Sequence, residues 1–447
     1  MLLRFLLGVL AAAYLTDAMA VNVYDLYALA LIRDPEFQVA VKEKDAALQN
    51  PGINRSYLLP NLSYGYNQAY NMQSLTVLPA SQGVPTTPYN YSSIVSQFNI
   101  SQTVVNFAQL ANYKKGIAQA AFGSEQYKTK ALSLAIRLLG AYFDVLYSSD
   151  QIRLLKSQIK SLSSQEIFNR KALEFGQGTK TDLVETQARL EVAQSQLIDA
   201  EDSLQNNLRL LQSYTGLTAD ELKSKIDPLK NNFSFLKAPN QALEEDEKVA
   251  LSINPDILAA KFNMEAARQD VNVKQAGQYP TATLQGSYGK TVSQYITQYN
   301  QQYNGGSIGF QVNVPIFAGG YNVYSTRQSM AALEMAEADL NLKTEKIKIE
   351  LQKQFNLLKS LRSQIAALGK AVESSKFLIE ATKKSIAGGV RTNIDLLNAE
   401  QQYVQVSRDL AKAKYDYMLA YARYKVAVGV FSDSDLAEIS TNLSQLP

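Results

Sequence analysis

Residues 387–395 read AGGVRTNID and interrupt a segment that has helical character for dozens of residues on either side. A second copy of the pattern lies at residues 175–182, FGQGTKTD. Glycine ends a helix well because it adopts a left-handed backbone without steric cost, and threonine and aspartate are favoured where the next helix begins. Each motif therefore predicts a tight hairpin between two helices. The shared residues are Gly176, Thr179 and Asp182 in the first copy and Gly389, Thr392 and Asp395 in the second.

Further matches indicate that the whole chain is duplicated. Asp-Pro-Glu at residues 34–36 corresponds to Asn-Pro-Asp at 254–256, and Pro60 corresponds to Pro280. A repeat of roughly 215 residues is too long for a solenoid and indicates one duplicated structural unit. We expect a leader at residues 1–20, a first repeat at 21–230 and a second repeat at 231–447.

The first twenty residues have the pattern of a secretion signal. Arg4 is followed by an apolar stretch at residues 5–15, and Ala18-Met19-Ala20 is a small-x-small cleavage signal. The sequence therefore predicts export with cleavage after Ala20, and a buried N-terminal helix is the alternative. No other run of about 18 apolar residues is evident, so we expect no helical membrane span in the mature chain.

Composition excludes several classes of chemistry. The chain has no Cys, no His and no Trp, which removes thiol nucleophiles, Ser-His-Asp hydrolysis and the usual zinc sites. We expect no metal, no cofactor and no enzymatic activity, with a carboxylate-pair enzyme as the alternative. A net charge of +3 predicts no nucleic-acid partner. Gly289-Lys290-Thr291 lacks the earlier glycine and the following helix of a phosphate loop, so we expect no nucleotide site.

Four short segments alternate in the manner of half-buried strands. In the first, Tyr64 and Tyr66 fall on one face, and Gly65 and Asn67 fall on the other. Polar, tyrosine-rich sequence at residues 73–92 and 293–306 is expected to form the loops between them. The predicted strands cover about 61–72, 93–104, 281–292 and 307–317.

The chemistry of the two strand faces favours a membrane barrel. One face carries Tyr, Phe and aliphatic residues, whereas the other carries small uncharged residues, as in a barrel with a lipid-facing exterior and a watery lumen. Two soluble hairpins over a core are the alternative. Four strands cannot close a barrel, for which about eight are needed, so a barrel would require several chains.

The segments between the strands and the glycine motifs predict very long helices. Ala193, Leu197, Ala200 and Leu204 are spaced by four and three residues, which is the seam of a coiled coil. Such seams need partner helices to cover them. A soluble periplasmic coiled-coil scaffold would explain these helices but not the leader or the tyrosine-rich strands. The predicted helices cover about 107–175, 180–215, 321–387 and 392–429.

The order of these elements resembles the TolC family of bacterial outer-membrane channels. The resemblance rests on Leu59-Pro60, Tyr279-Pro280, VPIFAGG at residues 314–320 and the paired G-x-x-T-x-x-D motifs. It implies a mixed α/β membrane protein that forms a homotrimer in the outer membrane of a Gram-negative bacterium. Each chain would give four strands to one twelve-stranded β-barrel, continuous with an α-helical coiled-coil barrel that crosses the periplasm.

Two segments, at residues 176–190 and 385–397, are most similar to the type I protein secretion branch of that family. This similarity implies an inner-membrane ABC transporter, a periplasmic adaptor (a membrane fusion protein) and an exported protein as partners, with outer-membrane lipid around the barrel. Drug-efflux channels share the fold and much of the motif. The alternative is therefore a channel that exports drugs with a proton-driven pump.

The resemblance also assigns roles at the second hairpin. Asp395 would face the axis and form a ring of three carboxylates, which attracts cations, while Arg391 and its acidic partner Asp182 would hold the entrance closed. Where family members often have a second inward acid, this chain has Asn398. Adaptor docking is implied for four turn residues, with local turn geometry as the alternative: Gly176, Thr179, Gly389 and Thr392.

Overall fold

The computed structural model describes residues 23–75, 87–230, 232–236, 243–294 and 300–443, so the predicted leader lies outside the described residues. The chain divides into two compact units. One unit contains Met1–Lys42, Gln126–Ile257 and Lys343–Pro447, and the other contains Glu43–Glu125 and Leu258–Leu342. Each unit therefore takes segments from both predicted repeats.

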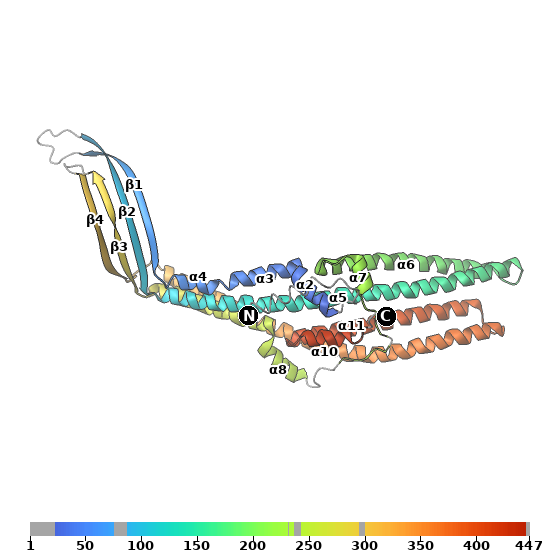
Figure 1. Cartoon of the computed structure of the whole chain (residues 1–447). Helices are drawn as coiled ribbons and strands as arrows, with labels where there is room; N and C mark the ends of the chain where they lie inside the picture. Colours follow the sequence, from blue (N-terminus) through green and yellow to red (C-terminus); the bar gives the residue numbers. More distant parts are fainter. Residues whose placement is uncertain (1–22, 76–86, 231, 237–242, 295–299, 444–447) are drawn as a thin grey trace. The chain divides into compact units, whose positions relative to one another are not determined.

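The second unit contains one antiparallel sheet in the order β1-β2-β3-β4 (Figure 1). The register pairs Tyr64 with Phe98, Phe98 with Tyr288, and Leu284 with Phe310. Since β2 belongs to the first repeat and β3 to the second, the two repeats meet at the centre of the sheet. The strands are β1 (Asn61–Leu75), β2 (Thr87–Val105), β3 (Thr281–Gln294) and β4 (Asn300–Asn313).

The strands extend into the segments predicted as loops at residues 73–92 and 293–306. β2 begins at Thr87 rather than near residue 93, because the ladder with β1 continues through tyrosine- and asparagine-rich sequence that can pair although it does not alternate cleanly. The prediction that the fourth strand reaches residue 317 was wrong. β4 ends at Asn313, shortly before Pro315, which has no backbone N–H to donate to a ladder.

Beside the sheet, the second unit holds α4 (Asn50–Ser56), most of α9 (Pro255–Gln275), a 3-10 turn at Ala276–Gln278, the end of α3 (Pro35–Ala47), and parts of the long helices α5 (Phe107–Glu174) and α10 (Tyr321–Ala387). Two glycines of α5 allow close approach of the chain around α4. A Cβ at Gly116 would lie 2.8 Å from the Asn50 carbonyl oxygen, and one at Gly123 would lie 2.4 Å from the Ala47 Cβ. An ion pair of 2.6 Å between Lys115 and Asp270 joins α5 to α9.

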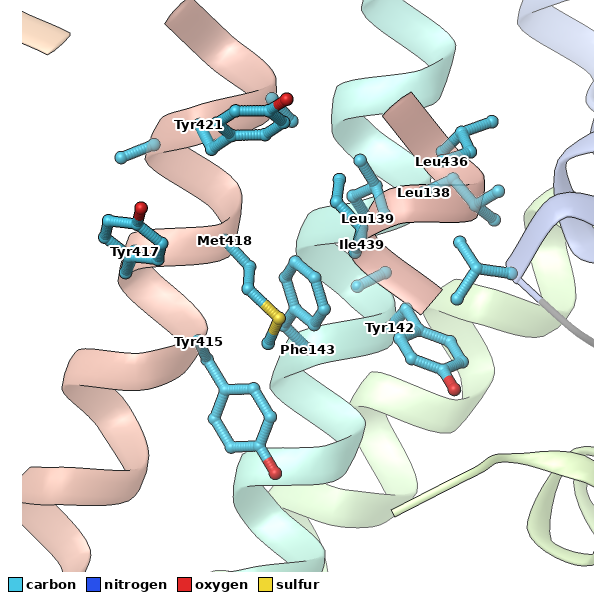
Figure 2. Close-up of a cluster of buried hydrophobic side chains, with 14 of the residues drawn as sticks. Leu138, Leu139, Tyr142, Phe143, Tyr415, Tyr417, Met418, Tyr421, Leu436 and Ile439 are labelled. Carbon is cyan, nitrogen blue, oxygen red and sulfur yellow. The ribbon is translucent and has the colours of Figure 1, made fainter. Parts of the chain in front are cut away.

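The first unit is helical and contains the main hydrophobic core. Leu138, Leu139 and Phe143 of α5 pack with Met418 of α11 and Ile439 of α12 (Figure 2). The helices that contribute to this unit, besides part of α5, are α2 (Val23–Arg33), α3 (Pro35–Ala47, in part), α6 (Lys180–Thr215), α7 (Ala219–Lys225), α8 (Leu243–Ile253), α10 (Tyr321–Ala387, in part), α11 (Asn393–Val428) and α12 (Asp433–Ser440). The four long helices α5, α6, α10 and α11 differ from their predicted ranges by at most one residue at either end.

Buried tyrosines fasten the short helices to α11. Tyr421 donates a hydrogen bond of 2.7 Å to Glu438 on α12, and Tyr424 donates one of 2.5 Å to Asp246 on α8. Burial and the neighbouring carboxylates raise the pKa of both phenols, so these tyrosines remain neutral donors. Each phenol hydroxyl thus has a hydrogen-bond partner, while the aromatic ring packs in the core.

The sequence showed no second run of about 18 apolar residues, but one helix contains a long apolar stretch. Within the described residues, α5 contains a window long and apolar enough to cross a membrane by length and composition, and 56% of that window is buried inside the chain. The buried residues of α5 from Leu134 to Leu146 belong to the core, where Leu138 and Phe143 are seen in Figure 2, and this burial explains the high hydropathy. Interspersed polar residues such as Arg137 and Asp144 concealed this stretch in the sequence.

Candidate functional site

The first tip turn joins α5 to α6 through Gly176, which has a φ of 70°. The Gln177 N–H donates to the Ala172 carbonyl at 2.8 Å, and this bond closes the end of α5. Thr179 then caps α6, since its hydroxyl accepts from the Asp182 N–H at 3.1 Å and donates to the Asp182 carboxylate at 2.6 Å. The capping roles expected for Gly176, Thr179 and Asp182 are therefore present in the structure.

The second tip turn joins α10 to α11 in the same way. Gly389 has a φ of 71°, and the Val390 N–H donates to the Ser385 carbonyl at 3.0 Å. At the start of α11, the Thr392 N–H and hydroxyl donate to one Asp395 oxygen at 3.0 and 2.9 Å. The duplicated sequence motif thus folds twice into the same turn, with the capping bonds arranged differently in the two copies.

The contacts of Asp395 favour its charged form. The two donors on Thr392 lower the pKa of this carboxyl, and the nearby Arg391 guanidinium contributes further in the same direction. The side chain is not buried, so solvent also supports the carboxylate. Asp395 is therefore an anion at neutral and mildly acidic pH, as a cation-attracting ring would require.

The structure does not bring Arg391 and Asp182 together within the chain. Arg391 instead donates from Nη1 to the hydroxyl of Thr382 on α10 at 3.1 Å, where Thr382 itself is fully buried. The Asp182 carboxylate accepts a hydrogen bond from the hydroxyl of Thr179, which caps the same helix. Within the described part of the chain, each of these two side chains thus braces its own hairpin.

A different arginine connects the two hairpins. Arg189 of α6 donates to Asn398 at 2.9 Å and to Gln401 at 3.1 Å, and both partners lie on α11. Glu185, one turn earlier on α6, pairs with the same guanidinium at 2.8 Å. The Glu185/Arg189 spacing was visible in the sequence as a helical ion pair, whereas nothing in the sequence could indicate the partners on α11.

Two further contacts hold the hairpins together near the tips. Asn169 is buried on α5, where it donates to Thr186 at 2.9 Å and accepts from Asn393 at 3.3 Å. Glu400 on α11 accepts from Ser161 at 2.7 Å. A small apolar cluster lies among these bonds and consists of Leu162, Ala193 and Leu397. Polar bonds and apolar packing thus position α11 against α5 and α6 in the isolated chain.

The fold of this chain is known from solved structures. The outer-membrane channel CmeC of Campylobacter jejuni superposes with a TM-score of 0.79 at 18% identity, and the match covers 95% of this chain and 90% of CmeC. A four-stranded sheet combined with paired long helical hairpins therefore defines this chain as having the fold of outer-membrane channels.

Sequence comparison gives the family. The chain matches the outer membrane efflux protein family over residues 26–217 and 248–430, one segment in each predicted repeat, and it belongs to that family. It is 35% identical to the alkaline protease secretion protein AprF of Pseudomonas aeruginosa, over 99% of this chain and 91% of AprF. It is 26% identical to the outer membrane protein TolC of Vibrio cholerae, over 98% of this chain and 96% of TolC. The resemblance to the TolC family is confirmed, and the chain is an outer-membrane protein.

We predict that Arg189→Met loosens the tip of α11. The substitution keeps much of the side-chain volume but removes the donors to Asn398 and Gln401, which for a partly exposed group costs about 1 kcal/mol. Hydrogen–deuterium exchange of peptides from the first three turns of α11 should become roughly fivefold faster.

The matched control is Arg209→Met, an exposed arginine on the same helix, which should leave exchange in α11 unchanged. Exchange in Arg189→Met at the unaltered rate would show that this arginine does not hold the two hairpins together.

Proposed function

We propose that the chain forms, as a homotrimer, the outer-membrane exit duct of a type I protein secretion system. In this role it receives unfolded protein from an inner-membrane ABC transporter and a periplasmic adaptor, and releases it outside the cell. The observation that best supports a membrane duct is the four-stranded sheet, which has two unpaired edges and one apolar face. The 35% identity to a protease secretion protein along nearly the whole chain supports protein as the cargo.

The sheet supports the trimer on physical grounds. β1 and β4 are its edges, and unpaired backbone N–H and C=O groups cannot face hydrocarbon because each costs several kcal/mol. A closed barrel removes all edges, and three copies of four strands supply twelve, which exceeds the practical minimum of about eight. Edge β1 of one copy would then pair with edge β4 of the next.

A drug-efflux channel is the second candidate function. The matched family is described as outer membrane efflux proteins. In that case a proton-driven pump would replace the ABC transporter. Secretion is favoured because AprF is the more similar of the two curated relatives compared, at 35% identity against 26% for TolC.

We also infer that the chain transports without catalysing a reaction. The absence of Cys and His from the whole sequence leaves neither thiol nor imidazole chemistry available. Family membership points in the same direction, since the family is one of outer-membrane channels. The energy for transport would come from the inner-membrane partner.

For the gate, we propose that three copies of Asp395 converge on the axis and narrow the entrance. Arg391 would reach Asp182 of the neighbouring copy, since within the described part of its own chain it contacts Thr382 and not Asp182. Surface ion pairs are worth about 0–1 kcal/mol each, so a partner protein with a few kcal/mol of preference for the open form could shift the population. Adaptor docking is proposed for the exposed turn residues Gly176, Thr179, Gly389 and Thr392.

Deletion of the gene in its own bacterium tests the cargo class. We expect a substrate of the type I system to accumulate inside the cell and disappear from the medium, with restoration by a plasmid copy. Susceptibility to a panel of drugs should stay within about twofold of the parent strain. Unchanged secretion together with strongly increased drug susceptibility would support the efflux alternative instead.

We predict that Asp395→Asn weakens block of the channel by a trivalent cation such as hexamminecobalt(III) by about tenfold or more, because three charges leave the entrance. In the unaltered protein, block should persist as pH falls from 7 to about 5, a range that lies above the ordinary carboxyl pKa. The Thr392 bonds lower the Asp395 pKa, and this opposes the increase that three nearby carboxylates cause in one another.

Block is measured in planar bilayers as the concentration that halves the conductance. Asp202→Asn removes a carboxylate from an exposed site on α6 and is the matched control. Equal block of Asp395→Asn and the unaltered protein would contradict the proposed ring.

A further inference from the structure

Lys290 is the only charged residue in the four described strands. The register places it on the apolar face of the sheet, because it lies two residues after Tyr288, which pairs with Phe98. Lys290 is exposed. A lysine on a lipid-facing strand costs about 2–4 kcal/mol at the centre of a bilayer and about 0–1 kcal/mol near its surface. The Lys290 ammonium must therefore either lie at the bilayer surface or pair with an anion.

Next to Lys290, the same face contains an apolar hollow of about 560 Å³. Two glycines, Gly286 on β3 and Gly306 on β4, form its floor. A Cβ at Gly286 would lie 3.0 Å from the Cγ2 of Ile100, and one at Gly306 would lie 2.6 Å from the Ser287 carbonyl oxygen, so the sheet admits only glycine there without a shift. The apolar walls are Leu62, Phe98, Ile100, Tyr288 and Ile308, and Ser287 and Ser307 complete the lining.

The walls are apolar and open to the outside. Ile308 is 86% exposed and Tyr288 is 68% exposed, although both are large hydrophobic residues. In the next row of this face after Tyr288, Lys290 is aligned with Ser96 on β2 and Asn304 on β4. This polar row is local, because Tyr66 on β1 is aligned with Ser96 and the following row contains Ile94 and Val292. Two residues along a strand span roughly 7 Å, so the charge lies at the mouth of the hollow. An apolar hollow bordered by a cation and two small polar side chains fits an amphipathic anion.

We propose that the hollow and Lys290 bind one phosphorylated membrane lipid per chain. An acyl chain lies over Gly286 and Gly306 between the apolar walls, and the lipid phosphate pairs with the Lys290 ammonium. Asn304 can donate a further hydrogen bond to the phosphate, whereas the Ser96 hydroxyl is already in contact with the Tyr64 hydroxyl at 3.0 Å. The proposal rests on the proposed barrel, in which this face is the exterior.

The direction of the chain indicates which leaflet of the membrane would contain the bound lipid. β3 starts directly after the helical segment that ends at Gln278, and Lys290 lies near the opposite end of the strand, towards the β3–β4 connection. If the helices extend into the periplasm, this end of the strand lies in the outer leaflet. The bound lipid would then fix the depth of the barrel in the membrane, since its phosphate marks the bilayer surface.

Native mass spectrometry tests the site on the intact protein. The protein is reconstituted with equal amounts of phosphatidylglycerol and phosphatidylcholine that have identical acyl chains, and the retained lipids are counted. We expect the unaltered protein to retain phosphatidylglycerol at least threefold over phosphatidylcholine. Lys290→Gln should reduce this ratio to about one. The matched control Lys376→Gln, an exposed lysine on α10 outside the sheet, should keep the unaltered ratio.

A competition arm distinguishes a lipid from a free phosphate group. Glycerol phosphate, which lacks acyl chains, should not displace phosphatidylglycerol, because the hollow supplies part of the affinity. Displacement by glycerol phosphate, or a Lys290→Gln protein that retains the unaltered lipid ratio, would overturn the proposal.

Conductance of the same preparations in planar bilayers separates this inference from the proposed function. A protein that conducts but shows no lipid preference contradicts the lipid site alone. A folded protein that neither inserts nor conducts contradicts the proposed channel.

Discussion

The unpaired edges of one four-stranded sheet are the constraint on which the rest of this protein depends. Within the described residues, β1 and β4 are the edges of the sheet, and each leaves a row of backbone donors and acceptors without a neighbouring strand. An outer-membrane protein cannot expose such rows to hydrocarbon, so the proposed assembly must be closed. Closure requires more than one copy of the chain, and we propose three. Trimer symmetry would then place six helix hairpins around one axis, and only this arrangement gives the tips a role beyond that of turns.

At the tips, each turn is stabilised locally, whereas the hydrogen bonds between the two hairpins are weak. Gly176 and Gly389 end their helices with the same left-handed geometry, and Thr179 and Thr392 begin the next ones, so each turn is locally determined. The links between hairpins are partly exposed and individually small, as in the contacts of Arg189 with Asn398 and Gln401. Rigid hairpins joined by weak bonds are suited to a gate, because a modest binding energy can separate them without unfolding the helices.

Local features of this structure could be predicted from the sequence, and tertiary ones could not. The turns and long helices follow from glycine, capping residues and hydrophobic spacing, all of which act over a few residues. The true extent of β2 was missed because its tyrosines and asparagines resemble a loop in composition while pairing as a strand. The partners of Arg189 lie more than 200 positions away, and no local pattern encodes such a contact. The absence of an Arg391–Asp182 pair within the chain was equally invisible in the sequence.

The most direct test of the account is the mass of the protein complex extracted from outer membranes in mild detergent and measured by native mass spectrometry. The proposed trimer predicts a single species that contains three copies of the chain, which dissociates to single chains only when heat unfolds the barrel. A stable, folded monomer would contradict the proposed closure, and a stable dimer would contradict the proposed trimer and, with it, the gate of three Asp395 side chains.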